Sequence, residues 1–293
     1  MDINKKHLIL IAGPTAVGKT SLAIELAIKY NTEIISTDSR QFYREMQIGT
    51  AAPTKEELSK AKHHFIGNLS IKDYYNVSIF EQEAIKLLVK LFETKDVVIA
   101  VGGSGLYVDA LCYGIDDLPD ADEKLRNEIK RKYNKYGIEY LQNEVKRLDP
   151  DYYSIADIKN PKRLQRALEV IYETGNTYSS QRTKKQKIRD FKIDKYVLNM
   201  NRELLYQRIN KRVDLMIEAG LEKEARGLFE YRELNALNTV GYKELFSYFN
   251  NEISLEQAIT DIKTHSRRYA KRQLTWFKRD NSFNWINGID EIK

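Results

Sequence analysis

Residues 8–30 read LILIAGPTAVGKTSLAIELAIKY. The apolar run at residues 8–11 predicts a buried strand, and the helical spacing of Leu22, Leu26 and Ala27 predicts a helix over residues 21–30. The loop between them matches G-x-x-x-x-G-K-[ST], a pattern that is specific for phosphate when it follows a strand and opens a helix. This loop comprises Gly13, Pro14, Thr15, Ala16, Val17, Gly18, Lys19 and Thr20. The stretch therefore predicts a phosphate site of the P-loop type.

The chemistry of this loop suits a phosphorylated ligand. Its glycines let backbone N–H groups close on phosphate oxygens, and the N-terminus of the helix adds a partial positive charge. Lys19 supplies a full positive charge, and the hydroxyl of Thr20 is a ligand for Mg²⁺. We therefore expect an anionic phosphate group and Mg²⁺ at this loop.

Most P-loop proteins hold ATP or GTP and place a metal-organising carboxylate at the end of a second buried strand. Here the wholly apolar run at residues 97–101, VVIAV, is followed by Gly102-Gly103-Ser104-Gly105, without a carboxylate. The nearest candidate is Asp38, directly after a short strand predicted at residues 33–36. Because ligands collect at the carboxyl edge of an open α/β sheet, we expect Asp38 at the same edge as the loop.

The order of the elements predicts an α/β fold with a P-loop NTPase-like core, in which a parallel sheet is flanked by helices. Residues 116–190 differ from this core, since they consist of charged segments with helical spacing, broken at residues 149–151 and 160–161. The strand pattern returns at residues 196–198. We therefore predict a catalytic core of residues 1–115 and 191–293, with a mostly helical insertion at residues 116–190.

Composition narrows the function classes. Among 293 residues, the longest apolar run is only five residues, far short of the roughly 20 that span a bilayer. The N-terminus lacks a signal-peptide pattern, so we expect a cytoplasmic protein without a membrane segment. The single Cys112 excludes an internal disulfide and a cysteine zinc cluster, and is expected to be buried. A net charge of +6, with six basic and no acidic residues at 267–279, suits a polyanionic partner.

Five blocks, in this order, resemble the signatures of the tRNA dimethylallyltransferase family. They are GPTAVGKT at 13–20, TDSRQFYREMQIGTAAPT at 37–54, VGGSGLYVDAL at 101–111, PKRLQRALEV at 161–170 and RRYAKRQLTWF at 267–277. Ser104 replaces the usual threonine but keeps a hydroxyl. Gly67-Asn68 replaces a usual aspartate, so no role is assigned there, and no zinc-finger extension follows residue 279, as in the shorter bacterial form.

The resemblance implies roles for the residues of the expected site. The loop would bind dimethylallyl diphosphate with Mg²⁺ at Thr20, and Arg208 would be an additional diphosphate-binding arginine, unless it is an ordinary solvated helix residue. Asp38 would be the general base for the adenine amine, although an aspartate after a strand is also a common helix N-cap. Thr20 and Arg208 would assist Asp38 in catalysis. Ser39 and Gln41 would contact the target base.

The resemblance also implies a set of tRNA contacts. Cations near residues 162–166 could follow the phosphate backbone, or could form a solvated helix face. The set comprises Asp38, Ser39, Arg40, Gln41, Ser104, Arg126, Lys162, Arg163, Leu164, Gln165 and Arg166. In residues 267–277 we expect a basic helix that packs through Ala270, Leu274 and Phe277 and leaves Arg268 and Arg272 outside. For Trp276, packing is favoured over stacking on a base.

The implied activity is transfer of a dimethylallyl group from dimethylallyl diphosphate to N6 of adenosine 37 in the anticodon loop of tRNA, with Mg²⁺. We expect a monomer whose partners are the anticodon stem-loop and dimethylallyl diphosphate. Two alternatives remain from the sequence. An adenylate isopentenyltransferase would act on free adenine nucleotides, and a P-loop NTPase could use the basic faces only to bind RNA.

Overall fold

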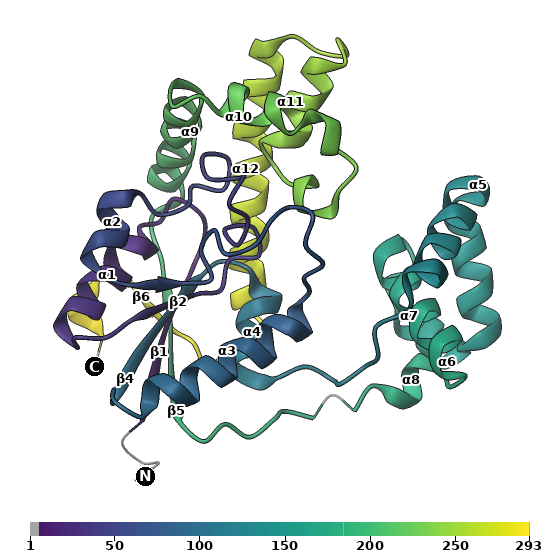
Figure 1. Ribbon diagram of the computed structural model, residues 1–293, viewed down its shortest axis with the longest axis horizontal. Helices are drawn as coiled ribbons and strands as arrows, with labels where there is room; N and C mark the ends of the chain where they lie inside the picture. Colours follow the sequence, from purple (N-terminus) through teal and green to yellow (C-terminus); the bar gives the residue numbers. More distant parts are fainter. Residues whose placement is uncertain (1–5, 184, 293) are drawn as a thin grey trace. The chain divides into compact units, whose positions relative to one another are not determined.

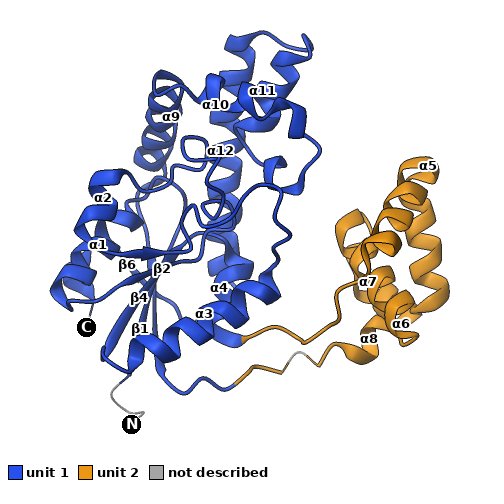
Figure 2. Ribbon diagram, in the orientation of Figure 1, with its two compact units in different colours: residues 1–113, 188–293 blue, residues 114–187 orange. Residues whose placement is uncertain are grey.

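The computed structural model describes residues 6–183 and 185–292. The chain divides into two compact units (Figure 2). Unit 1 consists of residues 1–113 and 188–293, and unit 2 consists of residues 114–187. Within the described residues, no helix combines the length and the apolar character that crossing a membrane requires.

Unit 1 contains a parallel sheet in the order β3-β2-β4-β1-β5-β6, which confirms the predicted α/β class (Figure 1). The strands are β1 (His7–Ala12), β2 (Ile34–Ser36), β3 (His63–His64), β4 (Val97–Gly102), β5 (Lys192–Leu198) and β6 (Asn284–Ile286). Parallel strands in the middle of such a sheet are covered on both faces, which explains their continuous apolar runs. The edge strands β3 and β6 are too short to give this pattern and were not predicted.

The two faces of β4 belong to different parts of the core. Val98 and Ala100 pack with helix residues on one face, whereas Ile99 and Val101 pack on the other. The first face is covered by α3 (Val77–Phe92) and α4 (Gly105–Tyr113), and the second by α1 (Lys19–Lys29). Each fully buried aliphatic side chain contributes about 1.5–3 kcal/mol, so these layers fix the strand ends that carry the site.

Helices α9 to α12 contribute to a third apolar cluster beside the sheet, and α2 is not part of it. Figure 1 shows α9, α10 and α11 together at one end of the sheet, with α12 running from this group alongside it. The bounds are α2 (Lys55–Lys60), α9 (Arg202–Glu218), α10 (Leu221–Gly227), α11 (Tyr242–Phe249) and α12 (Leu255–Phe277). On α12, Ala270 and Phe277 are buried and Arg268 and Arg272 are exposed, as predicted. Cys112 is also buried, as expected, and burial raises the pKa of its thiol to about 12.

Unit 2 is helical. Its helices are α5 (Glu123–Leu148), α6 (Pro150–Ile155), α7 (Pro161–Thr174) and α8 (Tyr178–Gln181). α5 and α7 pack through an apolar core that includes Leu141, Val145 and Leu168. The predicted breaks are confirmed, because Asp149 and Asn160 cap the two helices that begin with proline.

Candidate active site

The phosphate loop joins β1 to α1 in the context that its sequence predicts. α1 begins at Lys19 after Gly18, whose φ of 110° lies in the left-handed region that favours glycine. Gly13 has φ of 145°, and a Cβ there would stand 2.7 Å from the carbonyl oxygen of Leu198. The loop therefore follows the sheet edge closely, with its glycines at the positions where other residues would be strained.

Lys19 is the partly buried cation of this loop. Its Nζ donates to the carbonyl of Pro14 at 2.7 Å. Burial and, to a lesser extent, the Arg212 guanidinium lower the pKa of Lys19 to about 7, and Asp38 partly opposes this shift. A bound anion would favour the charged ammonium, so the loop is suited to a multiply charged phosphate ligand.

A cavity of about 580 Å³ opens at this edge of unit 1. Its size lies within the usual range of small-molecule sites. One part of its wall is polar and consists of side chains from the phosphate loop, from residues 38–41 after β2, and from helices α9 and α12. Another part is apolar and comes from α9, α10 and α12. Its lining includes Thr15, Lys19, Thr20, Asp38, Ser39, Arg40, Gln41, Ile209, Arg212, Val213, Met216, Leu221, Ile262, Tyr269 and Arg272.

Asp38 lines the same cavity as Lys19. No helix directly follows Asp38 in the chain, so the alternative that Asp38 is a helix N-cap is wrong. Its Oδ1 instead accepts a hydrogen bond from the Arg40 amide at 2.9 Å, within a turn. Asp38 raises the pKa of Lys19, and Tyr269, whose pKa burial raises to about 12, presents a neutral phenol to the same cavity. A partly exposed carboxylate thus faces the phosphate loop.

Arg212 of α9 lines the cavity together with Arg40, Arg268 and Arg272, whereas Arg208 does not. Arg212 donates to the hydroxyl of Thr15 at 3.2 Å and lines the cavity. Arg208, one turn earlier on α9, is exposed and does not line it, although its guanidinium lies beside Gly18. Arg212 is therefore a second candidate for the expected diphosphate contact, beside Arg208. Sequence reasoning missed Arg212 because both arginines directly precede a buried residue of the same apolar stripe, Ile209 or Val213.

The residues beside Asp38 are held by hydrogen bonds within the protein. Ser104 is buried; its Oγ accepts from the Ser39 amide at 2.9 Å and donates to the Ser39 hydroxyl at 3.0 Å. Gln41 donates to the carbonyls of Thr50 and Ala51 at 3.3 and 3.1 Å. Ser39, Arg40 and Gln41 line the cavity, whereas Ser104 supports the loop from behind.

The end of α12 ties two loops together. Gln273 is buried; its Oε1 accepts from the Thr15 amide at 2.9 Å, and its Nε2 donates to the carbonyl of Gly103 at 2.9 Å. Trp276 lies against Gly105, where a Cβ would collide with the indole, and Arg279 covers its ring at 3.7 Å. The expected preference of Trp276 for packing is confirmed, and the last signature block helps to build the phosphate site.

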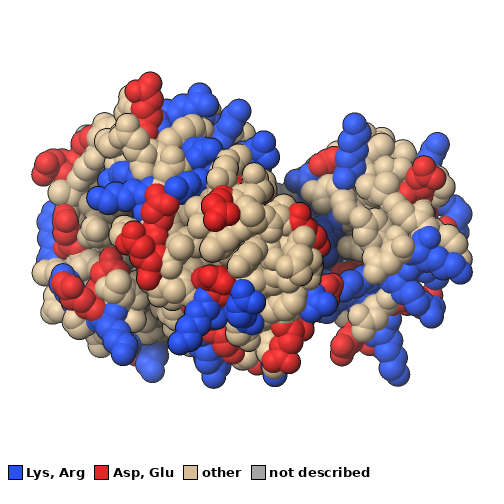
Figure 3. Space-filling view, turned by 90° about the horizontal axis from the view of Figure 1, so that it is seen from above, with Lys and Arg blue, Asp and Glu red and all other residues tan. Residues whose placement is uncertain are grey.

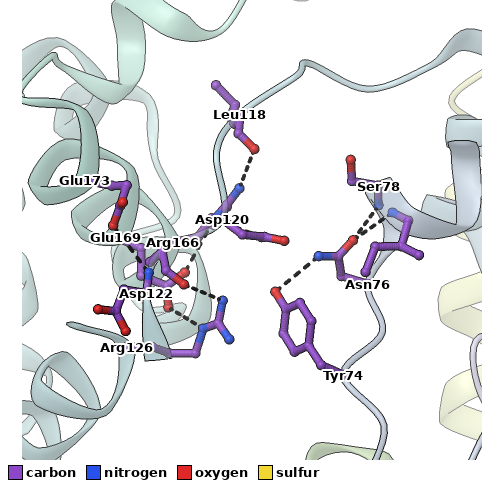
Figure 4. A network of polar contacts seen from close by, with 12 residues as sticks. Tyr74, Asn76, Ser78, Leu118, Asp120, Asp122, Arg126, Arg166, Glu169 and Glu173 are labelled. Carbon is purple, nitrogen blue, oxygen red and sulfur yellow. Dashed lines mark hydrogen bonds and ion pairs between the residues drawn. The ribbon is translucent and has the colours of Figure 1, made fainter. Parts of the chain in front are cut away.

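The expected tRNA contacts on unit 2 fall into three groups. Arg126 and Arg166 approach the carboxylate of Glu169 at 3.8 and 3.6 Å, and Arg166 also approaches Asp120 at 3.7 Å (Figure 4). Leu164 and Gln165 are buried, so these two side chains are not available at the surface of unit 2. Lys162 and Arg163 are exposed at the start of α7.

The two exposed cations of α7 form no ion pair within the described residues. On the face of unit 2 seen in Figure 3, Lys and Arg side chains are more numerous than Asp and Glu. Paired arginines such as Arg126 and Arg166 must give up or share Glu169 to reach a phosphate. Lys162 and Arg163 can bind one directly and are the stronger candidates for a polyanion.

Fold and site together define an α/β protein of the P-loop class, in which the phosphate-loop motif and a carboxylate line one cavity. Residues 41–280 match the model of the IPP transferase family, and the chain belongs to this family. It is 51% identical to "tRNA dimethylallyltransferase 1" of Bacteroides thetaiotaomicron over 98% of this chain and 93% of that one. It is 53% identical to the tRNA dimethylallyltransferase of Christiangramia forsetii, over 98% and 95%.

Solved structures agree with this assignment. The tRNA isopentenylpyrophosphate transferase of Bacillus halodurans is 38% identical, with a TM-score of 0.68 over 96% of this chain and 89% of that one. A eukaryotic dimethylallyltransferase solved in action on tRNA is 30% identical, with a TM-score of 0.76 over 92% of this chain and 69% of that one. The resemblance carried by the five sequence blocks is confirmed.

Proposed function

We propose that this protein transfers a dimethylallyl group from dimethylallyl diphosphate to N6 of adenosine 37 in the anticodon loop of tRNA. The observation that carries the proposal is that Asp38 and Lys19 line one cavity at the carboxyl edge of the sheet. Its relatives, which it matches over nearly their whole length, are named for this activity. None of these features favours free adenine nucleotides as the acceptor.

The phosphate loop, Lys19 and Arg212 serve the leaving group. As the allylic C–O bond breaks, negative charge grows on the diphosphate oxygens, and cations that are already in position lower the barrier. Arg212 is held by Thr15 of the loop and needs no rearrangement to meet an anion there. Arg208, exposed beside Gly18, contributes at most from outside the cavity.

Thr20 fits a role in binding Mg²⁺. Thr20 lines the cavity next to Lys19 in the chain, where a diphosphate would supply further oxygens. Within residues 6–183 and 185–292, no cluster of three or more His, Cys, Asp and Glu side chains is placed to hold a metal by itself. The ion would therefore depend on substrate oxygens, and when bound it would neutralise part of the diphosphate charge.

Asp38 serves the nucleophile. The exocyclic amine of adenine is a weak nucleophile because its lone pair is delocalised into the ring, so it needs a base. The N6–C bond forms as the C–O bond to diphosphate breaks, and the proton of the amine passes to the Asp38 carboxylate. The partly exposed position of Asp38 opposite Lys19 supports this role.

The acceptor must leave the stacked anticodon loop to reach Asp38. Lys162 and Arg163 of unit 2 would hold the RNA backbone, because they are exposed and form no ion pair within the described part of the chain. Because tRNA is the acceptor, we expect the protein to work in the cytoplasm.

The proposal is tested by incubating the protein with labelled dimethylallyl diphosphate, Mg²⁺ and an unmodified tRNA that carries an adenosine at position 37. Label should enter the tRNA, and an excess of AMP should not compete for it. Label in AMP but not in RNA would show the free-nucleotide activity. Hydrolysis of ATP without any transfer of label would overturn the proposal.

A further inference from the structure

A carboxylate outside the cavity holds one of the cavity walls. Glu224 of α10 accepts hydrogen bonds from the amides of Ile48 and Gly49 at 2.8 and 2.9 Å. It also accepts from the hydroxyl of Tyr242, at 2.7 Å. Tyr242 is fully buried, and a Cβ on Gly49 would stand 2.6 Å from its ring. Neither Glu224 nor Tyr242 lines the cavity, so neither can touch the substrate there.

The wall segment that Glu224 holds leads directly to the proposed base. Thr50 and Ala51, next in the chain, line the cavity, and their carbonyls accept from the side-chain amide of Gln41. The Gln41 Oε1 accepts from the Ser36 hydroxyl at 3.4 Å. The Ser36 oxygen in turn accepts from the backbone amide of Asp38 at 3.3 Å.

From this continuous path we propose that Glu224 is a positioning residue for prenyl transfer, which fixes the segment 48–51 and through Gln41 the loop that carries Asp38. The proposal rests on the function proposed above. A carboxylate is required because three donors converge on it and a carboxylate only accepts. An amide at this place would direct its own N–H groups at one of those donors, leaving it unsatisfied in a confined space.

The test is the Glu224→Gln variant, assayed for transfer of labelled prenyl group to tRNA. We expect kcat to fall about 10- to 100-fold, because small displacements of a catalytic group cost this much. The KM for dimethylallyl diphosphate should change less than about threefold, since the phosphate loop is held separately by Gln273. Tyr242→Phe, which removes one of the three donors, should lower kcat by a smaller factor of about two to five.

Glu45→Gln is the matched control. Glu45 lies on the same segment between β2 and β3 and accepts from the hydroxyl of Ser70 at 2.7 Å and the amide of Ile71 at 3.1 Å. It has no hydrogen bond to Gln41 and does not line the cavity. Its replacement should cost similar thermal stability and leave kcat unchanged.

A double-mutant cycle separates positioning from general weakening. If Glu224 acts through Gln41, then Gln41→Ala combined with Glu224→Gln should be little slower than Gln41→Ala alone. Equal kcat for the Glu224→Gln and Glu45→Gln variants, or fully multiplicative effects with Gln41→Ala, would overturn the proposal. If Glu224→Gln does not fold, the kcat of Tyr242→Phe relative to Glu45→Gln decides the same question. Absence of transfer by the unaltered protein would instead overturn the proposed function.

Discussion

Binding of dimethylallyl diphosphate should be coupled to uptake of a proton by Lys19. In the free protein, burial and the neighbouring Arg212 lower the pKa of Lys19 to about 7, whereas a bound diphosphate would hold the ammonium in its charged form. The depressed pKa means that the ammonium is mostly protonated below pH 7 and loses its proton as the pH rises through 7. Binding above pH 7 must therefore restore the missing proton.

The expected size of this coupling follows from the pKa of about 7. The fraction of Lys19 that lacks its proton is about 0.5 at pH 7 and about 0.9 at pH 8, and binding should take up these amounts per site. The affinity should fall about fivefold between pH 7 and pH 8, and about tenfold more by pH 9. The diphosphate loses its own last proton near neutral pH, which opposes this trend only at the lower end.

Titration calorimetry without tRNA, in buffers of different ionisation enthalpy, measures the proton uptake directly. Arg212→Gln is the informative variant. Without the neighbouring guanidinium the pKa of Lys19 should rise, so uptake at pH 8 should shrink even though binding itself weakens. Uptake near zero at pH 8 in the unaltered protein, with an affinity that is flat from pH 7 to 9, would refute the reasoning.

Three further outcomes are expected. Asp38→Asn should still bind tRNA in a filter assay but transfer the prenyl group about 10²- to 10⁴-fold more slowly, and unchanged turnover would remove Asp38 from the mechanism. Arg212→Gln should weaken binding of dimethylallyl diphosphate at pH 6.5 by at least about tenfold, and Arg208→Gln should weaken it by less than about threefold. The reverse order would identify Arg208 as the main diphosphate-binding arginine. Replacing Lys162 and Arg163 together by Gln should raise the KM for tRNA and reduce the salt dependence of binding by about one to two phosphate contacts, with little effect on kcat.

Most of the framework of unit 1 was predictable because its signals are local. The phosphate loop needs only a strand before it and a helix after it, and the run at 97–101 is apolar because both faces of β4 are covered. β3 and β6 have only two and three residues and lie at the edges, where neither periodicity nor apolar length marks a strand.

The parts of the site that sequence reasoning missed depend on tertiary contacts. Arg208 and Arg212 have equivalent places relative to the apolar stripe of α9, and only the position of Thr15 distinguishes them. Leu164 lies within a block of cations, yet α7 turns it into the core. A match to a motif assigns a role to every residue in it, whereas packing decides which of these side chains are available to a ligand.

The bridge formed by Gln273 bears on how the enzyme is made. Thr15 and Gln273 are 258 positions apart, so the phosphate loop leaves the ribosome long before its partner exists. A nascent chain, or a product of a late premature stop, contains the entire loop motif but lacks the side chain that joins it to Gly103. Such incomplete chains should bind prenyl diphosphate poorly. The ability to bind it should arise only when synthesis of the chain is nearly complete.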